Sequence, residues 1–219
     1  MDFTELLRAI SIWAIPALLA ITLHEVAHGW TARYFGDRTA QLLGRLSLNP
    51  LRHVDAIGTV LIPASFLALG LPPLGWAKPV PVDTSGMHNP RRAAVSIALA
   101  GPAANLLMAI LWCSVLAFIL QVRRGQTWDT WVLVMAHAGI KVNVVLTLFN
   151  LLPIPPLDGG RVLIGLLPTR LGAGLERLAP AGMFIVVGLS VLGLLSWLFR
   201  PAYRAADHVI SVLWTGLSA

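Results

Sequence analysis

Long apolar segments separated by short polar ones dominate the pattern of this chain. Four of the segments are long enough to cross a membrane, because a spanning helix needs about 20 apolar residues. Their expected limits are residues 4–34, 91–120, 128–152 and 181–199. In lipid, backbone polar groups must be satisfied within the chain, which favours helices. We therefore predict an all-α integral membrane protein, a polytopic helical bundle of about four to six membrane segments.

Three segments depart from this pattern. Residues 56–71 are apolar but interrupted by Gly58 and Pro63. We expect them to dip into the membrane and return, or to lie along its surface, rather than to cross it. Prolines at alternate positions of residues 76–82 exclude a helix and indicate an extended segment or edge strand. Beyond Tyr203, apolar residues at helical spacing beside charged ones indicate an interfacial helix.

Local signals set two further boundaries. Asn89 followed by Pro90 is typical of an N-cap and the first residue of a helix. Residues 153–160 read PIPPLDGG and cannot be regular helix throughout. A short helical piece is expected to follow them, up to Leu167.

Composition agrees with a membrane protein, since 57% of the 219 residues are hydrophobic and 12% are charged. The net charge of +6 is spread between the apolar segments, so we expect contact with lipid headgroups and no nucleic-acid partner. Cys113 is the single cysteine, which excludes a disulfide within the chain and a cysteine-based metal site. We expect one membrane-embedded domain over residues 1–219, with its core in 4–168 and a C-terminal span and interfacial helix in 178–219.

The first apolar segment contains H-E-x-x-H, spelled by residues 24–28. Ionisable side chains inside a membrane helix are costly to keep there and therefore indicate a function. Residues i and i+4 lie one turn apart on the same face, so the imidazoles of His24 and His28 can reach one metal ion. Glu25 would lie beside the metal without binding it, where it can act on water. The alternative is a pair of helix histidines bonded to nearby polar groups.

A catalytic zinc ion needs a third protein ligand and an open position. Asp158 is the candidate, because it stands in irregular backbone between prolines and glycines. Such backbone at membrane depth is tolerated only inside protein or facing a wet cavity, and an acidic residue there needs a positive partner. The alternative is that Asp158 only caps a helix beginning at Gly159. We predict one zinc ion per chain, bound by His24, His28 and Asp158.

Three motifs occur along the chain in a fixed order. Residues 24–30 read HEVAHGW, residues 101–105 read GPAAN, and residues 150–159 read NLLPIPPLDG. In these motifs the chain resembles the site-2 protease family of intramembrane zinc metalloproteases, in the minimal branch without PDZ or CBS domains. The resemblance covers most of residues 20–168, and the chain from about Gly172 onward matches no motif of the family.

The resemblance implies roles for the motif residues. His24, His28 and Asp158 would bind zinc, and Glu25 would be the general base that moves a proton from water to the leaving amine. The implied activity is hydrolysis of peptide bonds within or near transmembrane segments of membrane proteins, as in regulated intramembrane proteolysis. The expected partners are a transmembrane protein or peptide substrate and the lipid bilayer.

The resemblance also places two amides among the catalytic residues. Asn105 and Asn150 would lie near the scissile peptide, where either could steady the developing oxyanion. The alternative for each is an interhelical hydrogen bond. Residues 75–81 resemble a membrane-associated β-hairpin that presents substrate, and an exposed strand edge could hold an unwound substrate by β-addition. A simple proline-rich connector is the alternative for this segment.

The basic residues suggest an orientation. With the N-terminus outside, ten lysines and arginines fall on the cytoplasmic side and five outside, as the positive-inside rule requires. The active site would then lie towards the cytoplasm of a prokaryotic cell, in a multi-pass protein of the inner (plasma) membrane. His53 and His88 fall in loops, where we expect surface histidines.

Two other functions fit part of the pattern. A membrane metal-ion transporter can also carry histidine and aspartate inside the membrane, although it has no need of Glu25 as a base. A catalytically inactive relative that serves as a membrane binding module is the other alternative, and the complete set of expected ligands argues against it.

Overall fold

The computed structural model describes residues 3–68, 75–84, 86–122 and 129–217, and within them the chain forms helices and no strand. The elements are, in chain order, α1 Phe3–Tyr34, α2 Thr39–Leu42, the 3-10 helix η1 Pro50–Arg52, the π-helix η2 Ala56–Leu61, α3 Ile62–Ala68, α4 Pro90–Val122, α5 Asp129–Asn150, α6 Asp158–Leu166, α7 Thr169–Glu176, α8 Ala179–Val191 and α9 Leu194–Leu217.

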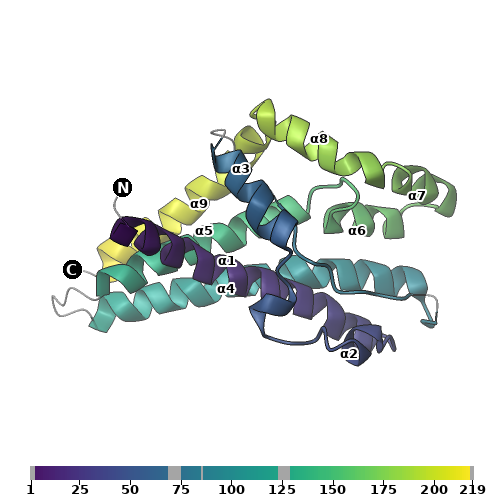
Figure 1. The fold of residues 1–219 in the computed structure, drawn as a ribbon, viewed down its shortest axis with the longest axis horizontal. Coiled ribbons are helices and arrows are strands. Elements are labelled where there is room, and N and C mark those ends of the chain that lie inside the picture. The colour runs from purple at the N-terminus through teal and green to yellow at the C-terminus, as the bar shows by residue number, and fades with distance from the viewer. Residues whose placement is uncertain (1–2, 69–74, 85, 123–128, 218–219) are drawn as a thin grey trace.

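Three long helices form the centre of the molecule. α1, α4 and α5 run side by side along its long axis, and α4 also contacts α6 and α9 (Figure 1). Among the described residues, these three helices are long and apolar enough to cross a membrane, and α7 with α8 forms a pair bent by 64° that makes a fourth if counted as one span. The predicted all-α membrane bundle is confirmed, at the lower end of the expected number of segments.

The start of α4 follows the local signal in the sequence. The helix begins at Pro90, and the Asn89 side-chain oxygen accepts a hydrogen bond from the Arg92 amide at 3.3 Å. Proline loses nothing at this position, because the first amides of a helix have no partner within it. The predicted N-cap is therefore confirmed.

The predicted continuous span over 181–199 is wrong. The chain breaks between α8 and α9 at Gly193, whose φ of 72° lies in the left-handed region. The Gly193 amide donates to the Ser190 carbonyl at 2.9 Å, which closes the end of α8. A positive φ cannot continue a right-handed helix, and glycine adopts it without steric cost. α9 then runs without interruption past Tyr203, so the expected separate interfacial helix is its second half.

α9 packs back onto the central helices. Side chains from α4, α5 and α9 form a buried apolar cluster, and its members are Leu116, Leu120, Leu133, Ala136, Ile140, Ala206 and Ile210. Beside this cluster, Lys141 of α5 and Asp207 of α9 form an ion pair at 2.8 Å. The C-terminal helix is therefore anchored to the bundle by apolar packing, with one charged contact at the edge.

η2 and α3 together make a short apolar element. They comprise 13 residues and begin at Asp55, whose carboxylate accepts hydrogen bonds from the Ile57 and Gly58 amides at 3.1 and 2.7 Å. At about 1.5 Å per residue the element spans roughly 20 Å, less than the hydrocarbon core of about 30 Å. The described part of the segment is therefore too short to cross the membrane by itself, and residues 69–71 of the expected segment lie outside the described residues.

Residues 75–84 form no helix, and the amides of alternate residues Trp76, Lys78 and Val80 face the protein, as in the extended segment that the alternating prolines predict. They form no strand in the described part of the chain, so the extended loop is the observed form and the β-hairpin is not. The Trp76 amide donates to the Gly58 carbonyl at 3.1 Å, and the Lys78 amide donates to the His53 carbonyl at 2.9 Å. These bonds tie one edge of the extended segment to the protein.

Arg45 and His53 complete this attachment. The Arg45 guanidinium donates to the carbonyls of Lys78 and Pro79 at 2.7 and 3.2 Å, and also to that of Arg52. His53, expected at the surface, is fully buried, with its Nε2 2.8 Å from the Ser47 carbonyl. The loop between α1 and η2 therefore forms a fixed base for the extended segment.

Asp37 holds the far end of the same segment. Its Oδ1 accepts a hydrogen bond from the Thr39 amide and its Oδ2 accepts one from the Asp83 amide, each at 2.8 Å. Burial alone would raise the pKa of Asp37, but these hydrogen bonds to the charged form outweigh it and lower the pKa. The ionised carboxylate therefore joins the end of α1 to the extended segment.

We expect Asp37→Asn to destabilise the protein by roughly 1–2 kcal/mol at neutral pH, because one amide oxygen cannot accept both hydrogen bonds. A group with a lowered native pKa stabilises the fold above its unfolded pKa, about 3.9 for aspartate, and loses that contribution as the pH falls through the native pKa. The difference between the variant and the wild type should therefore shrink below about pH 4. Thermal unfolding in detergent at several pH values measures it, and a difference that stays constant down to low pH would contradict the account.

Candidate metal centre

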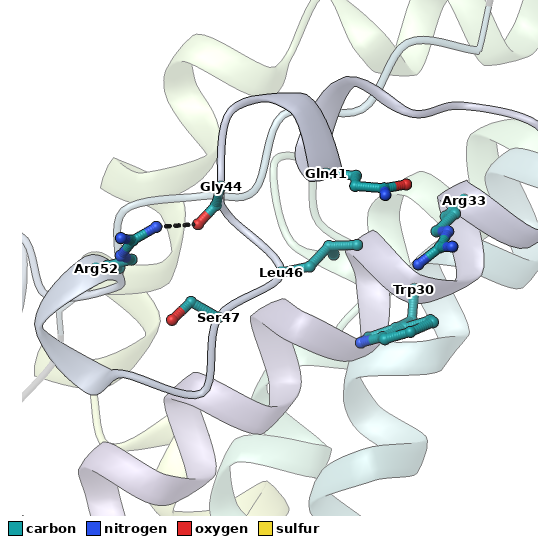
Figure 2. Close-up of a pocket in the computed structure, with 7 residues that line it drawn as sticks. All are labelled: Trp30, Arg33, Gln41, Gly44, Leu46, Ser47 and Arg52. Carbon is teal, nitrogen blue, oxygen red and sulfur yellow. Dashed lines mark hydrogen bonds between the residues drawn. The ribbon is translucent and has the colours of Figure 1, made fainter.

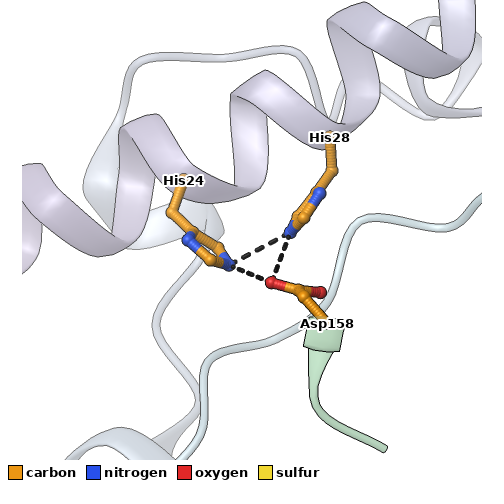
Figure 3. Close-up of side chains that lie close together, drawn as sticks. All are labelled: His24, His28 and Asp158. Carbon is orange, nitrogen blue, oxygen red and sulfur yellow. Dashed lines mark hydrogen bonds and ion pairs between the residues drawn. The ribbon is translucent and has the colours of Figure 1, made fainter. Parts of the chain in front are cut away.

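Three ligand-type side chains meet inside the helical bundle. His24 and His28 project from one face of α1 toward Asp158, the first residue of α6 (Figure 3). Asp158 Oδ2 lies 3.1 Å from His24 Nε2 and 3.3 Å from His28 Nε2, and the two Nε2 atoms are 3.0 Å apart. All three residues are buried. The structure thus brings together the three residues that the sequence singles out as metal ligands.

The position of Asp158 depends on the turn that precedes α6. A Cβ atom on Gly159 would lie 2.3 Å from the Leu151 carbonyl oxygen, and one on Gly160 would lie 2.3 Å from the Pro155 nitrogen. Only glycine permits such an approach, so α6 can begin directly against the backbone of the turn. Leu157, not Asp158, is the N-cap of α6, and it makes no side-chain capping bond. The alternative role of Asp158 as a helix cap is therefore not observed.

The outer nitrogens of both imidazoles contact oxygen atoms. His24 Nδ1 lies 2.9 Å from Asn105 Oδ1, and His28 Nδ1 lies 2.6 Å from the Ile97 carbonyl oxygen, both on α4. A carbonyl oxygen can only accept, so each Nδ1 carries a proton, and in the neutral imidazole each Nε2 then presents a lone pair. This arrangement is typical of metal-binding histidines, whose second nitrogen is held by an acceptor.

The three inner atoms fit a cation. Two lone pairs and a carboxylate oxygen face one another in a buried space, and Asp158 Oδ2 makes no hydrogen bond within the described part of the chain. When both imidazoles are neutral these atoms repel, and a buried charge without a partner is costly. Two imidazoles and one carboxylate are a ligand set that catalytic zinc uses, with a further position left open.

Glu25 connects the extended segment to this centre. Its Oε2 accepts a hydrogen bond from the Val80 amide at 2.8 Å, and no described residue bonds to its Oε1. The side chain is half-buried, and in sequence it lies between the two histidines of the motif. The Val80 amide was not predicted from the sequence, because no pattern of residues indicates which backbone group will meet a carboxylate 55 positions away.

The two asparagines have different surroundings. Asn105 is fully buried, and besides its contact with His24 its Nδ2 has no partner in the described part of the chain. Asn150 is half-buried, and its Nδ2 donates to the Leu146 carbonyl at 3.0 Å within α5. The structure therefore places Asn105 in direct contact with a candidate ligand, whereas the observed bond of Asn150 lies within its own helix.

Gly101 allows α4 to approach the imidazoles. A Cβ atom at this position would lie 2.4 Å from His28 Nε2 and 2.5 Å from His24 Cε1. Sequence reasoning used Gly101 only as part of the G-P-x-x-N motif and missed this contact. Since Nε2 is the metal-facing nitrogen, any side chain at residue 101 enters the space between the ligands.

We expect Gly101→Ala to reduce metal affinity by about 10–100-fold, as changes beside metal ligands do. Gly188→Ala is the matched control, because Gly188 lies in α8 with nothing within 4 Å of its added Cβ. Metal content per chain after dialysis against a weak chelator, measured by mass spectrometry, compares the variants. Wild-type metal retention by Gly101→Ala would contradict this account of the site.

Comparisons with known proteins agree with this geometry. The family model described as Peptidase family M50 matches residues 13–123 and 117–193. A Bacillus subtilis (strain 168) protein named "Putative zinc metalloprotease YwhC" is 36% identical over 205 residues, covering 93% of this chain and 90% of the relative. A Mycobacterium tuberculosis (strain ATCC 25618 / H37Rv) protein named "Putative zinc metalloprotease Rip2" is 35% identical, covering 90% of this chain and 78% of that relative.

No solved structure matches the chain. The family match covers well over half of the 219 residues, and it includes H-E-x-x-H, Asn105 and Asp158. The apolar helices place these residues in an integral membrane protein, and their chemistry suits zinc. The chain therefore belongs to peptidase family M50, the site-2 protease family, and is a membrane zinc metalloprotease.

Proposed function

We propose that the protein is an endopeptidase that cuts peptide bonds within or near transmembrane segments of other membrane proteins, as in regulated intramembrane proteolysis. The observation that carries this proposal is the buried cluster of His24, His28 and Asp158, in which both histidines lie on a helix apolar enough to span the membrane. A hydrolytic site at that depth serves substrates that are themselves in the membrane.

His24, His28 and Asp158 hold the zinc ion in this proposal, one ion per chain. The bound ion supplies Lewis acidity, which acidifies water and polarises a carbonyl group. Asn105 and the Ile97 carbonyl fix the two imidazole rings, so that both Nε2 atoms face Asp158. The ligands therefore need little rearrangement to bind the ion.

Glu25 acts as the general base. It takes a proton from the attacking water and passes it to the amine that leaves. The hydrogen bond from the Val80 amide holds Oε2, while Oε1 has no partner among the described residues and is available for the proton. Because Oε2 is fixed by this hydrogen bond, Oε1 is held in a defined orientation for proton transfer.

Asn105 and Asn150 complete the proposed catalytic residues. Asn105 Nδ2 is a buried donor without a partner in the described part of the chain, and such a donor is suited to the oxyanion that develops on the scissile carbonyl. Asn150 Nδ2 has a second hydrogen beyond the one it gives to Leu146. Either amide can stabilise that oxygen once the substrate peptide is in place.

The substrate is bound as an unwound segment, because a helix hides its carbonyls in its own hydrogen bonds. The inner edge of residues 75–84 is already bonded through Trp76, Lys78 and Val80. The opposite edge carries Ala77, Pro79 and Pro81. The carbonyls of Ala77 and Pro81 make no hydrogen bond to described residues, and they offer acceptors for the amides of an extended substrate.

Glu25→Gln tests the catalytic role. The variant should keep one zinc per chain and lose at least about a hundredfold in the rate of cleavage of a transmembrane substrate in proteoliposomes, because the amide cannot accept the proton. Glu176→Gln is the matched control on an exposed position of α7. His24→Ala should lose both zinc and cleavage.

Cleavage at the wild-type rate by Glu25→Gln would end the proposal for this residue. Zinc uptake into proteoliposomes by the wild type, without any cleavage, would instead favour a metal transporter. Zinc binding with neither cleavage nor uptake would favour a membrane binding module.

We also propose an orientation, in which the N-terminus lies outside the inner membrane of a prokaryotic cell and the metal centre lies towards the cytoplasm. α1 and α5 then run in the same direction, with α4 as the return crossing and α3 not crossing. The excess of basic residues on the cytoplasmic loops supports this arrangement.

Cysteine labelling tests the orientation on a Cys113→Ser background, which has no other thiol. A cysteine replacing the exposed Lys78 should react with an impermeant reagent in inverted vesicles and not in spheroplasts. A cysteine replacing Gly125, between α4 and α5, should show the reverse. Labelling of residue 78 from outside would mean that the segment before it crosses the membrane, which would overturn the arrangement.

A further inference from the structure

The loop between α1 and η2 contains a side chain that reaches the extended segment beside Glu25. This side chain is Arg45, which follows Gly44, where a φ of 64° turns the chain. The Arg45 amide donates to the Ala40 carbonyl at 2.8 Å. The Arg52 guanidinium donates across the same loop to the Gly44 carbonyl at 2.6 Å (Figure 2). The backbone from which Arg45 projects is therefore fixed by bonds within the loop.

The Arg45 guanidinium binds backbone carbonyl groups. Its Nη2 donates to the carbonyls of Lys78 and Pro79 at 2.7 and 3.2 Å, and its Nη1 donates to that of Arg52. The ion pairs found among the described residues do not include Arg45. The positive charge of this side chain therefore acts on peptide groups, and two of the three belong to the extended segment.

One peptide group joins Arg45 to Glu25. The Pro79 carbonyl accepts from Arg45, and the Val80 amide, which donates to Glu25 Oε2 at 2.8 Å, belongs to the same peptide bond. This bond is trans, so its C=O and N–H point in opposite directions. A guanidinium at the oxygen polarises the peptide, and hydrogen bonds connected in this way strengthen one another. Arg45 therefore supports, through one peptide group, the bond that holds Glu25.

Side-chain packing holds the same peptide against α1. Gly29 lies one turn beyond Glu25, and a Cβ atom at Gly29 would lie 2.4 Å from Leu46 Cδ2 and 3.1 Å from Val80 Cγ1. Leu46 follows Arg45 in the loop, so the loop and the extended segment pack together on this turn of α1. Val80 is buried there. The peptide thus has little room to reorient while Arg45 holds its oxygen.

We propose that Arg45 is a positioning residue for the general base, and that it orients Glu25 through the Pro79–Val80 peptide. This inference rests on the proposed function, because it takes Glu25 as the base. The Val80 amide holds Oε2, so a stronger bond there fixes more closely the direction in which Oε1 faces the attacking water. A displacement of about 1 Å at a reacting group can lower a rate about a hundredfold, so loss of this support should lower kcat.

A double-mutant cycle with Glu25 tests this role in the zinc-loaded protein. Arg45→Gln should lower kcat for cleavage of a transmembrane substrate in proteoliposomes by about tenfold or more, and by a larger factor than it raises KM. In the Glu25→Gln background the same change should leave the residual rate nearly unaltered, because the group that Arg45 positions is no longer a base. Loss by the same factor in both backgrounds would show a purely structural role and overturn the proposal.

Arg52→Gln is the matched control. It removes an arginine side chain and its hydrogen bond from the same loop, but no donor to the extended segment. It should keep the wild-type kcat. An equal fall of kcat in Arg52→Gln and Arg45→Gln would assign the effect to the loop in general and overturn the positioning role.

The Val80 amide proton provides a readout that does not need cleavage. A charge-assisted hydrogen bond is short and moves an amide proton to low field in the NMR spectrum. In zinc-loaded protein with isotopically labelled valine, assigned by the signal that Val80→Ile removes, we expect a low-field Val80 amide. It should move upfield in Arg45→Gln and in Glu25→Gln, but not in Arg52→Gln. A wild-type signal at the position of an unbonded amide would overturn the proposal whatever the variants do, including variants that fold poorly.

Two results separate this inference from the proposed function. Cleavage at the wild-type rate by Glu25→Gln would overturn the base itself, and the positioning role with it. A large loss in Glu25→Gln together with the wild-type kcat in Arg45→Gln would overturn the positioning role alone and leave the proposed function in place.

Discussion

Electrostatic repulsion between three buried atoms is the constraint on which this structure depends. The Nε2 atoms of His24 and His28 and Oδ2 of Asp158 lie within 3.3 Å of one another, and neutral imidazoles protonated at Nδ1 have no proton to place between them. The Nε2 atoms point toward Asp158 because the Nδ1 atoms on the other side of each ring are hydrogen-bonded to oxygen atoms of α4. The chain thus holds, inside an apolar bundle, an arrangement of three electron-rich atoms that favours a bound cation.

Small residues let four helices meet at this point. Gly101 brings α4 against the imidazoles, and Gly159 and Gly160 bring the start of α6 against the turn before it. On the outer side of that turn, a Cβ atom on Gly182 of α8 would lie 1.6 Å from the Pro155 carbonyl oxygen. α8 therefore packs against the turn, and the position of Asp158 is fixed by the contacts that α6 and α8 make with that turn. Close packing through glycine is a general means of association between membrane helices, and here it also fixes a ligand.

The parts of the structure that local chemistry determines could be predicted from the sequence. The histidine pair, Asp158 and the Asn89 cap follow from spacing and residue type. The break at Gly193 could not be found in this way, because a glycine in an apolar run has the same hydropathy whether or not its φ is positive. Contacts of backbone groups, such as that of Val80 with Glu25, depend on how distant segments pack, and the burial of His53 has the same origin.

The alternating prolines of residues 75–84 also limit contact between two molecules of the enzyme. On the open edge Ala77 retains an amide hydrogen, whereas Pro79 and Pro81 have none. Two such edges placed together would have only the Ala77 amide of each to donate, so they would form a poor version of the ladder by which exposed extended segments self-associate. A substrate chain without prolines at these positions supplies the backbone amide donors that Pro79 and Pro81 lack. The same edge can therefore favour a different polypeptide over a second copy of itself, without any contact that recognises a side chain.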